Sequence, residues 1–363
     1  MAYVTKPSLV FPPYLVRTPE ILQEMEASVL QETEASGKGP YLERVRGFEL
    51  GVEERYFVAP LEVIAKPGTM EERNDIALTG MNRLAIQAAD SALTQAGLAA
   101  TDIDCIITSN STTPKIPGLD VYLVNTLGLR PDVLRMPFTT LGCVGGAHTL
   151  SIAIQLADAR PGMRALIVVG EALSAVYQPG DNSLTGLMYR QLFGDSAGAC
   201  VVSSDPRGAC LETHGSWQTV VPDTMNTYRL VSAANGQHFL SDYKAQKAIT
   251  KLTPPLKQWL DDRAPGWTVH NIVGHPGGPA VLRYLAEGLG FPDDPDGLLV
   301  HAWDSLRRYG NLGGTSVLHI LGMTADAPPH PDPETLIVAM GPGLSGAAVL
   351  GTLHPTGQAH QPG

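Results

Sequence analysis

The apolar positions of the chain follow helical and strand periods in alternation. From residue 74 to residue 97, alanine, leucine and methionine recur every third or fourth position, which predicts an amphipathic helix. Gly97 is placed to end that helix, because glycine readily takes the left-handed conformation of a helix C-cap. Residues 104–109 are an almost continuous apolar run, which predicts a strand that is buried on both faces.

The same reasoning predicts the other elements. In the first half these are a short helix at 120–127, a buried helix at 145–159 and buried strands at 165–171 and 199–203. In the second half they are a strand at 270–274, a helix to about 289, a helical end at 304–309, a helix at 315–323 and strands at 336–340 and 347–353. Residues 1–60 show no regular pattern beyond an amphipathic stretch at 18–33, and the polar last ten residues are expected to be frayed.

Strands that alternate with helices in both halves predict an α/β fold with mixed sheets. A Ser-Asp-Pro-Arg-Gly turn at 204–208 divides the chain into residues 1–208 and residues 209–363. No low-complexity linker separates these halves, so we expect them to pack into one body.

Composition narrows the class of protein. The chain has 363 residues, of which 44% are hydrophobic and 17% charged, as in an ordinary globular protein. Its net charge of −11 argues against a nucleic-acid or membrane-surface role. The N-terminus lacks the pattern of a signal peptide, and no apolar run approaches the roughly 18 residues that a membrane span needs. We therefore expect neither a nucleic-acid nor a membrane partner.

The four cysteines, Cys105, Cys143, Cys200 and Cys210, fall at no metal-ligand spacing. The sequence consequently predicts no metal site. Free thiols are typical of a reducing compartment, which predicts a cytoplasmic location.

Cys143 lies between small residues, just before the buried helix at 145–159. The positive end of a helix dipole and its free N–H groups favour a thiolate, the reactive form of cysteine. Gly142 and Gly145 permit a sharp turn and the close approach of a substrate. The alternative is that Cys143 is a small buried hydrophobic residue, as most free cysteines are.

Two further polar residues lie in glycine-rich loops. His275 begins His-Pro-Gly-Gly-Pro at 275–279, and Asn311 ends Tyr-Gly-Asn at 309–311. Cysteine, histidine and asparagine are the parts of a thiol nucleophile, its proton partner and a hydrogen-bond donor. Taken separately, each also has a structural interpretation, since histidine and asparagine are common in turns.

Together these segments resemble the type III polyketide synthases, the chalcone and stilbene synthase family of the thiolase superfamily. The matching segments occur in the family's order and are GC-x-GG at 142–146, HPGGP at 275–279, YGN at 309–311 and GPG at 341–343. Leu-Phe-Gly-Asp at 192–195 and Arg55-Tyr56 also match, so the resemblance runs from about residue 50 to residue 353. Leu-Gly-Gly-Thr after Asn311 replaces the plant Met-Ser-Ser-Ala, which favours a bacterial member.

The resemblance implies a thiolase-like, five-layered α-β-α-β-α fold of two similar halves, and a homodimer. It implies that Cys143 carries an acyl group taken from a CoA thioester. His275 is then the partner of the thiolate, and with Asn311 it holds the thioester carbonyl while malonyl-CoA loses CO₂. Claisen condensation, with or without cyclisation, follows. The substrates are an acyl-CoA starter and malonyl-CoA, and no metal or redox cofactor is implied.

The resemblance also assigns residues around this centre. Phe193 and Phe239 match two gatekeeper phenylalanines between the CoA tunnel and the cavity, and Val176 lies near a cavity-lining position. The loop at 341–346, with Gly343 and Leu344, resembles the one that shapes the cavity wall, and Gly278 lies in the histidine segment.

Two predictions concern the surface. Arg44, Arg46 and Arg55 lie near the family's contacts to the CoA phosphates, although three glutamates crowd the same region. Ile116 lies near the family position that reaches across the dimer interface.

Three alternatives remain open at this stage. An acyltransferase or hydrolase could use the same acyl-cysteine without condensation, and an enzyme like ketoacyl synthase III could condense once. A non-catalytic subunit on the same fold is the third. The sequence leaves the starter unit, the number of extensions and the mode of release undetermined.

Overall fold

The computed structural model describes residues 1–36, 50–112, 114–206, 208–242, 244–266, 268–292 and 294–354. Arg44 and Arg46 lie outside the described residues. All but the first of the last ten residues, which were predicted to be frayed, also lie outside them.

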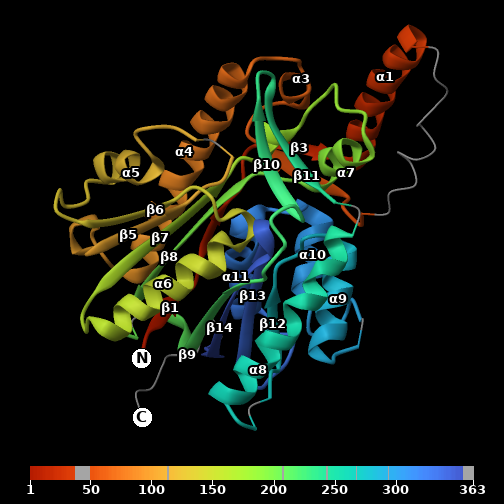
Figure 1. The fold of residues 1–363 in the computed structure, drawn as a ribbon. Helices are drawn as coiled ribbons and strands as arrows, with labels where there is room; N and C mark the ends of the chain where they lie inside the picture. Colours follow the sequence, from red (N-terminus) through yellow and green to blue (C-terminus); the bar gives the residue numbers. More distant parts are fainter. Residues whose placement is uncertain are drawn as a thin grey trace.

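A large mixed sheet runs through the molecule (Figure 1). In the described residues it has ten strands, which are β1 (Tyr3–Thr5), β2 (Ser8–Val10), β5 (Cys105–Ser109), β6 (Leu134–Phe138), β7 (Arg164–Glu171), β8 (Ser196–Ser203), β9 (Ala209–Val220), β12 (Asn271–Gly274), β13 (Glu334–Gly341) and β14 (Ser345–Leu353). Their order is β12-β13-β14-β9-β1-β8-β7-β5-β6, and β2 pairs with β8. The short strand β1 is antiparallel to both β8 and β9, so it joins the two halves of the sheet.

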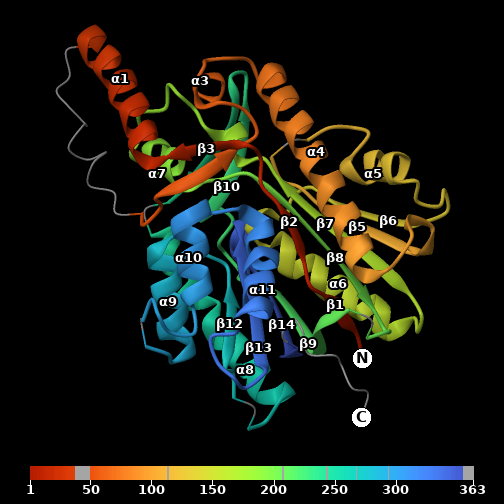
Figure 2. The same cartoon turned by 180° about the vertical axis from the view of Figure 1, so that it is seen from behind.

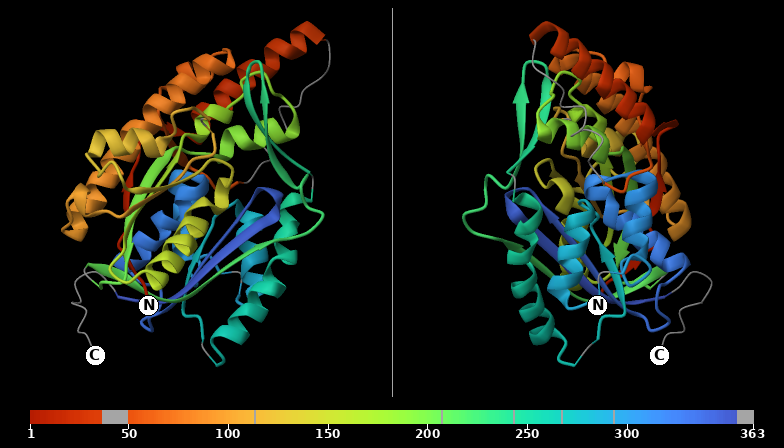
Figure 3. Two further views of the ribbon diagram at one scale, coloured as in Figure 1. Left: turned by 60° about the vertical axis from the view of Figure 1, so that its left-hand side comes forward. Right: turned by 90° about the vertical axis from the view of Figure 1, so that its right-hand side faces the viewer.

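We call β6, β5, β7 and β8 the first wing, and β9, β14, β13 and β12 the second wing. Two helices, α6 (Gly145–Ala159) and α11 (Ser316–Asp326), pack against each other, and both contact the two wings (Figure 2). The other faces are covered by α4 (Met70–Ala96) and α5 (Leu119–Leu127) on the first wing and by α8 (Thr253–Arg263), α9 (Pro279–Leu289) and α10 (Val300–Tyr309) on the second. Figure 3 shows the layers in sequence, and the predicted five-layered, thiolase-like fold is confirmed.

The burial of both faces of a strand explains its sequence pattern. Successive side chains of a strand point to opposite faces of the sheet. In β7, Ile167 and Val169 belong to the core around α6, whereas Leu166 and Val168 belong to the core under α4. Both faces of this strand are therefore covered, which is why it reads as a continuous apolar run.

The predicted helix at 74–97 is confirmed, but it begins earlier. Thr69 caps α4 in a capping box with Glu72, and Gly97 closes the helix with φ 65°. The capping pair lies outside the apolar repeat, so periodicity alone placed the start too late.

The amphipathic stretch at 18–33 is α1 (Thr18–Ser36), but the expectation that the rest of residues 1–60 is irregular is wrong. Besides β1 and β2, this region contains β3 (Tyr14–Arg17) and β4 (Glu54–Phe57). Strands of three or four residues are too short to show a period. The sequence also did not predict α3 (Leu61–Ile64), α7 (Leu184–Leu192) or the hairpin of β10 (Tyr228–Ala233) and β11 (Gly236–Ser241). Within the described part of the chain, no helix is both long and apolar enough to cross a membrane.

Candidate active site

Cys143 lies in a single 3-10 turn, Gly142–Val144, between β6 and α6. Gly142 has φ 58°, and a Cβ at this position would lie 2.7 Å from Cδ of Pro342. Only glycine meets both conditions without strain. This contact brings the loop between β13 and β14 against the cysteine.

His275 follows β12 directly. Its backbone N–H donates a hydrogen bond to the carbonyl of Val338 at 2.9 Å, which extends the parallel pairing of β12 and β13 by one residue. The side chain is buried, and among the described residues its Nδ1 has no hydrogen-bond partner. An imidazole nitrogen is therefore available to a thiol or to a substrate carbonyl.

Asn311 is held on three sides. Its N–H donates to the carbonyl of Leu192 at 2.8 Å, and its own carbonyl accepts from Gly194 at 3.1 Å. Side-chain Oδ1 accepts a hydrogen bond from the N–H of Gly313 at 2.8 Å. Because Oδ1 is engaged, Nδ2 is the donor in the hydrogen bond between this side chain and Cys143.

The residue before Asn311 permits this close approach. Gly310 has φ 71°, and a Cβ there would lie 2.5 Å from the carbonyl oxygen of Leu192. The glycine of Tyr-Gly-Asn is thus required by the backbone.

Two cavities meet at Cys143. The narrow cavity, of about 40 Å³, is lined by Cys143, His275 and Asn311 together with Phe193 and Phe239. The wide cavity, of about 350 Å³, is lined by Cys143, Phe193, Phe239 and Val176, among others. A larger hollow of about 500 Å³ lies near α3 and the start of α4, and its lining contains neither a cysteine nor a histidine. The three predicted catalytic residues are therefore brought together, and a chamber large enough for a small ligand adjoins them.

Phe193 and Phe239 form the boundary between the cavities, because both line both of them. Their ring centroids are 5.3 Å apart at 87°, an edge-to-face contact. Tyr189 stacks on Phe193 at 5.2 Å, and its hydroxyl donates to Oγ of Ser241 at 2.7 Å. This geometry agrees with the gatekeeper positions that the resemblance implies.

Burial has the largest effect on the ionisation of the centre. Burial, together with the nearby carboxyl of Glu171, raises the pKa of Cys143 to about 12. Hydrogen bonds from Asn311 and from the backbone act in the opposite direction. Burial thus opposes the stabilisation of the thiolate that was expected from the helix start, because loss of hydration disfavours the charged form.

Burial also lowers the pKa of His275 to about 3. Burial of each group therefore disfavours its charged form when that charge stands alone. A proton that moves from Cys143 to His275 creates two opposite charges in one cavity, and each stabilises the other.

Glu171 is a buried group that the sequence analysis did not single out. Its carboxylate accepts a hydrogen bond from Oγ of Ser111 at 2.6 Å and one from the backbone N–H of Ser111 at 3.3 Å. Burial raises the pKa of this carboxyl to about 8. In the sequence it reads only as the last residue of a buried strand.

The remaining predicted site residues divide into two groups. Val176 lines the wide cavity, as predicted. Gly278, Gly343 and Leu344 are not among the described residues that line either cavity, and the neighbouring Gly277, Gly341 and Pro342 are found there instead. The two loops are correctly predicted, but the residues that face the cavities are shifted by one or two positions.

Arg55 does not fit the predicted contact with CoA phosphates. Its side chain is completely buried, and Nη2 donates a hydrogen bond to the carbonyl of Gln191. Burial lowers its pKa to about 10. A guanidinium in the interior cannot reach a phosphate in solvent.

Several cavity residues had no signal in the sequence. The narrow cavity is completed by side chains from α7, the β10–β11 hairpin and the turn before α8, including Met188, Tyr189, Tyr228 and Gln246. These elements were not predicted, and on them the resemblance assigned only Phe239, so the other cavity-lining side chains were missed.

Comparison with known proteins identifies the family. Residues 57–206 match the N-terminal domain of chalcone and stilbene synthases. A 1,3,6,8-tetrahydroxynaphthalene synthase of Streptomyces peucetius subsp. caesius is 34% identical over 314 residues, which is 83% of this chain and 80% of that protein. Germicidin synthase of Streptomyces coelicolor, a type III polyketide synthase, has a structure that matches with a TM-score of 0.89 and 33% identity, covering 97% of this chain and 99% of that one.

The structure of 1,3,6,8-tetrahydroxynaphthalene synthase of Streptomyces coelicolor A3(2) matches with a TM-score of 0.87 and 27% identity, covering 98% of this chain and all of that one. A cysteine, a histidine and an asparagine on a thiolase-like fold define an acyl-transferring condensing enzyme. The chain belongs to the chalcone and stilbene synthase family, the type III polyketide synthases. Its Streptomyces relatives agree with the bacterial affinity that was predicted from the residues after Asn311.

Proposed function

We propose that the protein loads an acyl group from a CoA thioester onto Cys143 and extends it with units derived from malonyl-CoA. The observation that carries this proposal is that Cys143, His275 and Asn311 line one narrow cavity, which shares Phe193 and Phe239 with a chamber of about 350 Å³. The membership of the family supports the same chemistry.

In the loading step, His275 takes the proton of Cys143 as the sulfur attacks the thioester carbonyl. The carbon–sulfur bond to CoA breaks, and the departing thiolate takes up the proton from His275. His275 lines the same narrow cavity as Cys143, which suits a group that must accept and return a proton. The product is an acyl thioester on Cys143.

In the decarboxylation step, the malonyl thioester of malonyl-CoA lies beside Cys143, with its thioester carbonyl toward His275 and Nδ2 of Asn311. Loss of CO₂ leaves an electron pair that spreads onto this carbonyl oxygen. Donors already aimed at the oxygen stabilise the charge as it develops, and they act strongly because the site is shielded from water.

In the condensation step, the carbanion attacks the acyl carbonyl on Cys143. A carbon–carbon bond forms, the carbon–sulfur bond to Cys143 breaks, and the Cys143 thiolate is released as a chain longer by two carbons leaves on CoA. A proton taken up from water then restores the thiol. The wide cavity then accommodates the extended chain, and its size sets how many extensions fit. No metal or redox cofactor is required for these steps.

The test is incubation with malonyl-CoA carrying a labelled carboxyl group and a panel of acyl-CoA starters, beside Cys143→Ala. Release of labelled CO₂ and a chain-extended product that Cys143→Ala does not form are the expected results. Acylation of Cys143 without CO₂ release would instead identify an acyltransferase or hydrolase. A single extension for every starter would favour an enzyme like ketoacyl synthase III.

We further propose that the protein is a homodimer. Ile116 is 97% exposed on the loop before α5, which supports its predicted place across a subunit interface. Light scattering coupled to size-exclusion chromatography tests this, with Ile116→Asp expected to shift the mass toward the monomer. A cytoplasmic location also remains a proposal, supported by the four free cysteines.

A further inference from the structure

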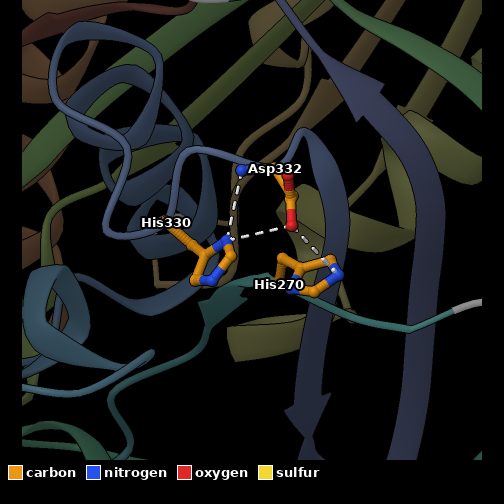
Figure 4. A group of neighbouring side chains, drawn as sticks. All are labelled: His270, His330 and Asp332. Atoms are coloured by element: carbon orange, nitrogen blue, oxygen red, sulfur yellow. Dashed lines mark hydrogen bonds and ion pairs between the residues drawn. The ribbon is translucent and has the colours of Figure 1, made fainter.

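A cluster of two imidazoles and one carboxylate lies at the end of β12 that is remote from His275. His270 immediately precedes β12, and His330 and Asp332 lie in the loop before β13 (Figure 4). Since β12 separates His270 from His275, the cluster is roughly 16 Å from the catalytic histidine at about 3.3 Å per strand residue. No sequence spacing indicates it, because 60 residues separate the two histidines.

The three side chains point toward one another. Oδ2 of Asp332 is 3.7 Å from Nε2 of His270 and 3.7 Å from Nδ1 of His330. One ligand atom from each residue lies within 4.8 Å of the others. Bonds of about 2.1 Å in a tetrahedral zinc site separate ligand atoms by about 3.4 Å, so small side-chain rotations bring all three onto one cation.

The hydrogen bonding of His330 sets its neutral tautomer. Nδ1 of His330 accepts a hydrogen bond from the backbone N–H of Asp332 at 3.1 Å. An accepting Nδ1 carries no proton, so the neutral ring has its proton on Nε2. The single lone pair of Nδ1 is directed at this N–H, so coordination of a cation through Nδ1 replaces this hydrogen bond.

The framework around the cluster is already ordered. Asn271 is fully buried, and its Nδ2 donates to the carbonyl of Asp332 at 2.7 Å while its Oδ1 accepts from the N–H of His330 at 3.1 Å. Prolines on both sides of His330 and Asp332 fix the backbone φ angles of the loop. Binding of a cation therefore orders little additional chain.

We propose that His270, His330 and Asp332 bind one divalent transition-metal cation of the zinc class. Imidazole nitrogens favour zinc, cobalt, nickel and copper over magnesium and calcium, which prefer oxygen ligands. The side chains are 26%, 38% and 59% exposed, so water completes the coordination. The cation joins the start of β12 to the loop before β13, and it stabilises the second wing without entering the chemistry at Cys143.

The experiment titrates the full chain, carrying no histidine tag and freed of metal with EDTA, with CoCl₂ and then with ZnCl₂ as a competitor. It uses a Cys143→Ser background, because a thiolate beside His275 could itself bind these ions. We expect one Co²⁺ per chain with visible absorption, its displacement by Zn²⁺, and a rise in melting temperature at saturation. His330→Ala is expected to weaken binding by at least about tenfold and to abolish the rise.

The matched control is His238→Gln. His238 also faces a carboxylate, with Nδ1 at 4.0 Å from Oδ2 of Asp181, but it is outside the cluster. Its loss is expected to leave Co²⁺ affinity unchanged. Asp332→Asn keeps the shape of the loop and removes the charge of the carboxylate. It therefore tests the contribution of the cluster to Co²⁺ binding if His330→Ala does not fold. Absence of saturable binding, or equal affinity of the Cys143→Ser protein with and without Asp332→Asn, overturns the proposal.

Discussion

Replacement of Asn311 separates decarboxylation from acyl loading. The N–H of Gly313 holds Oδ1 at 2.8 Å, so Nδ2 is the group that remains to donate to a thioester oxygen. Removal of one donor from such a site typically costs a hundred- to a thousand-fold in rate, or about 3–4 kcal/mol. We therefore expect Asn311→Ala to slow the release of CO₂ from malonyl-CoA by about that factor.

Acyl loading depends on Asn311 less strongly. The hydrogen bond from Asn311 lowers the pKa of Cys143, so its loss makes the thiolate harder to form. A single hydrogen bond of this kind is worth about 0.5–1.5 kcal/mol, which corresponds to a roughly tenfold change at most. The expected signature is a large loss in decarboxylation beside a small loss in the acylation of Cys143.

The assay follows both steps on one preparation. Conversion of malonyl-CoA to acetyl-CoA without a starter reports decarboxylation, and intact-mass spectrometry with an acyl-CoA reports acylation. Asn311→Asp is the matched variant, because its oxygen can still accept from Gly313 while the donor is lost. Equal losses in both steps would refute the reasoning and show that Asn311 acts only through the cysteine. Wild-type decarboxylation in Asn311→Asp would refute it as well.

Three other substitutions test the structure. Gly310→Ala places a Cβ 2.5 Å from a carbonyl oxygen at a residue with φ 71°. We therefore expect urea unfolding to show a loss of more than about 1 kcal/mol in unfolding free energy. A variant as stable as wild type would contradict the close contact. Glu171→Gln removes a charge that raises the pKa of Cys143. The pH midpoint for alkylation of Cys143 by iodoacetamide should therefore move to lower pH. An unchanged midpoint would show that Glu171 does not affect the ionisation of Cys143. Burial lowers the pKa of His319 to about 4, so the unfolded chain binds more protons between about pH 6.5 and pH 4 and stability falls as the pH drops through that range. His319→Gln should remove about 3 kcal/mol of the difference in unfolding free energy between pH 6.5 and pH 4. Urea unfolding at these two pH values measures it, and the same difference in His319→Gln and wild type would exclude the effect.

Local sequence was sufficient for much of the architecture. Buried strands such as β7 and helices such as α4 were predicted because many side chains repeat one environment along a short stretch. The catalytic loops were predicted for a different reason. Each requires specific residues at adjacent positions, such as glycine where Gly142 and Gly310 meet a neighbouring chain.

Tertiary structure decided everything that depends on distant partners. β1 has only three residues, and its place in the sheet comes from its pairing with β8 and β9. The same holds for Arg55, which the sequence suggests is at the surface and the fold buries completely. The ionisation of Cys143 follows this rule too, since desolvation, which raises the pKa of its thiol, depends on the whole set of surrounding elements.

Sequence by itself therefore determined the family, the main layers and the three residues of the centre. Only the folded chain brought Phe239 from an unpredicted hairpin against Phe193, and His270 against a loop 60 residues away. Periodicity and short motifs report what neighbouring residues share along the chain. Hydrogen bonds, desolvation and cavity walls are made between residues that are far apart in it, and their energies exist only after folding.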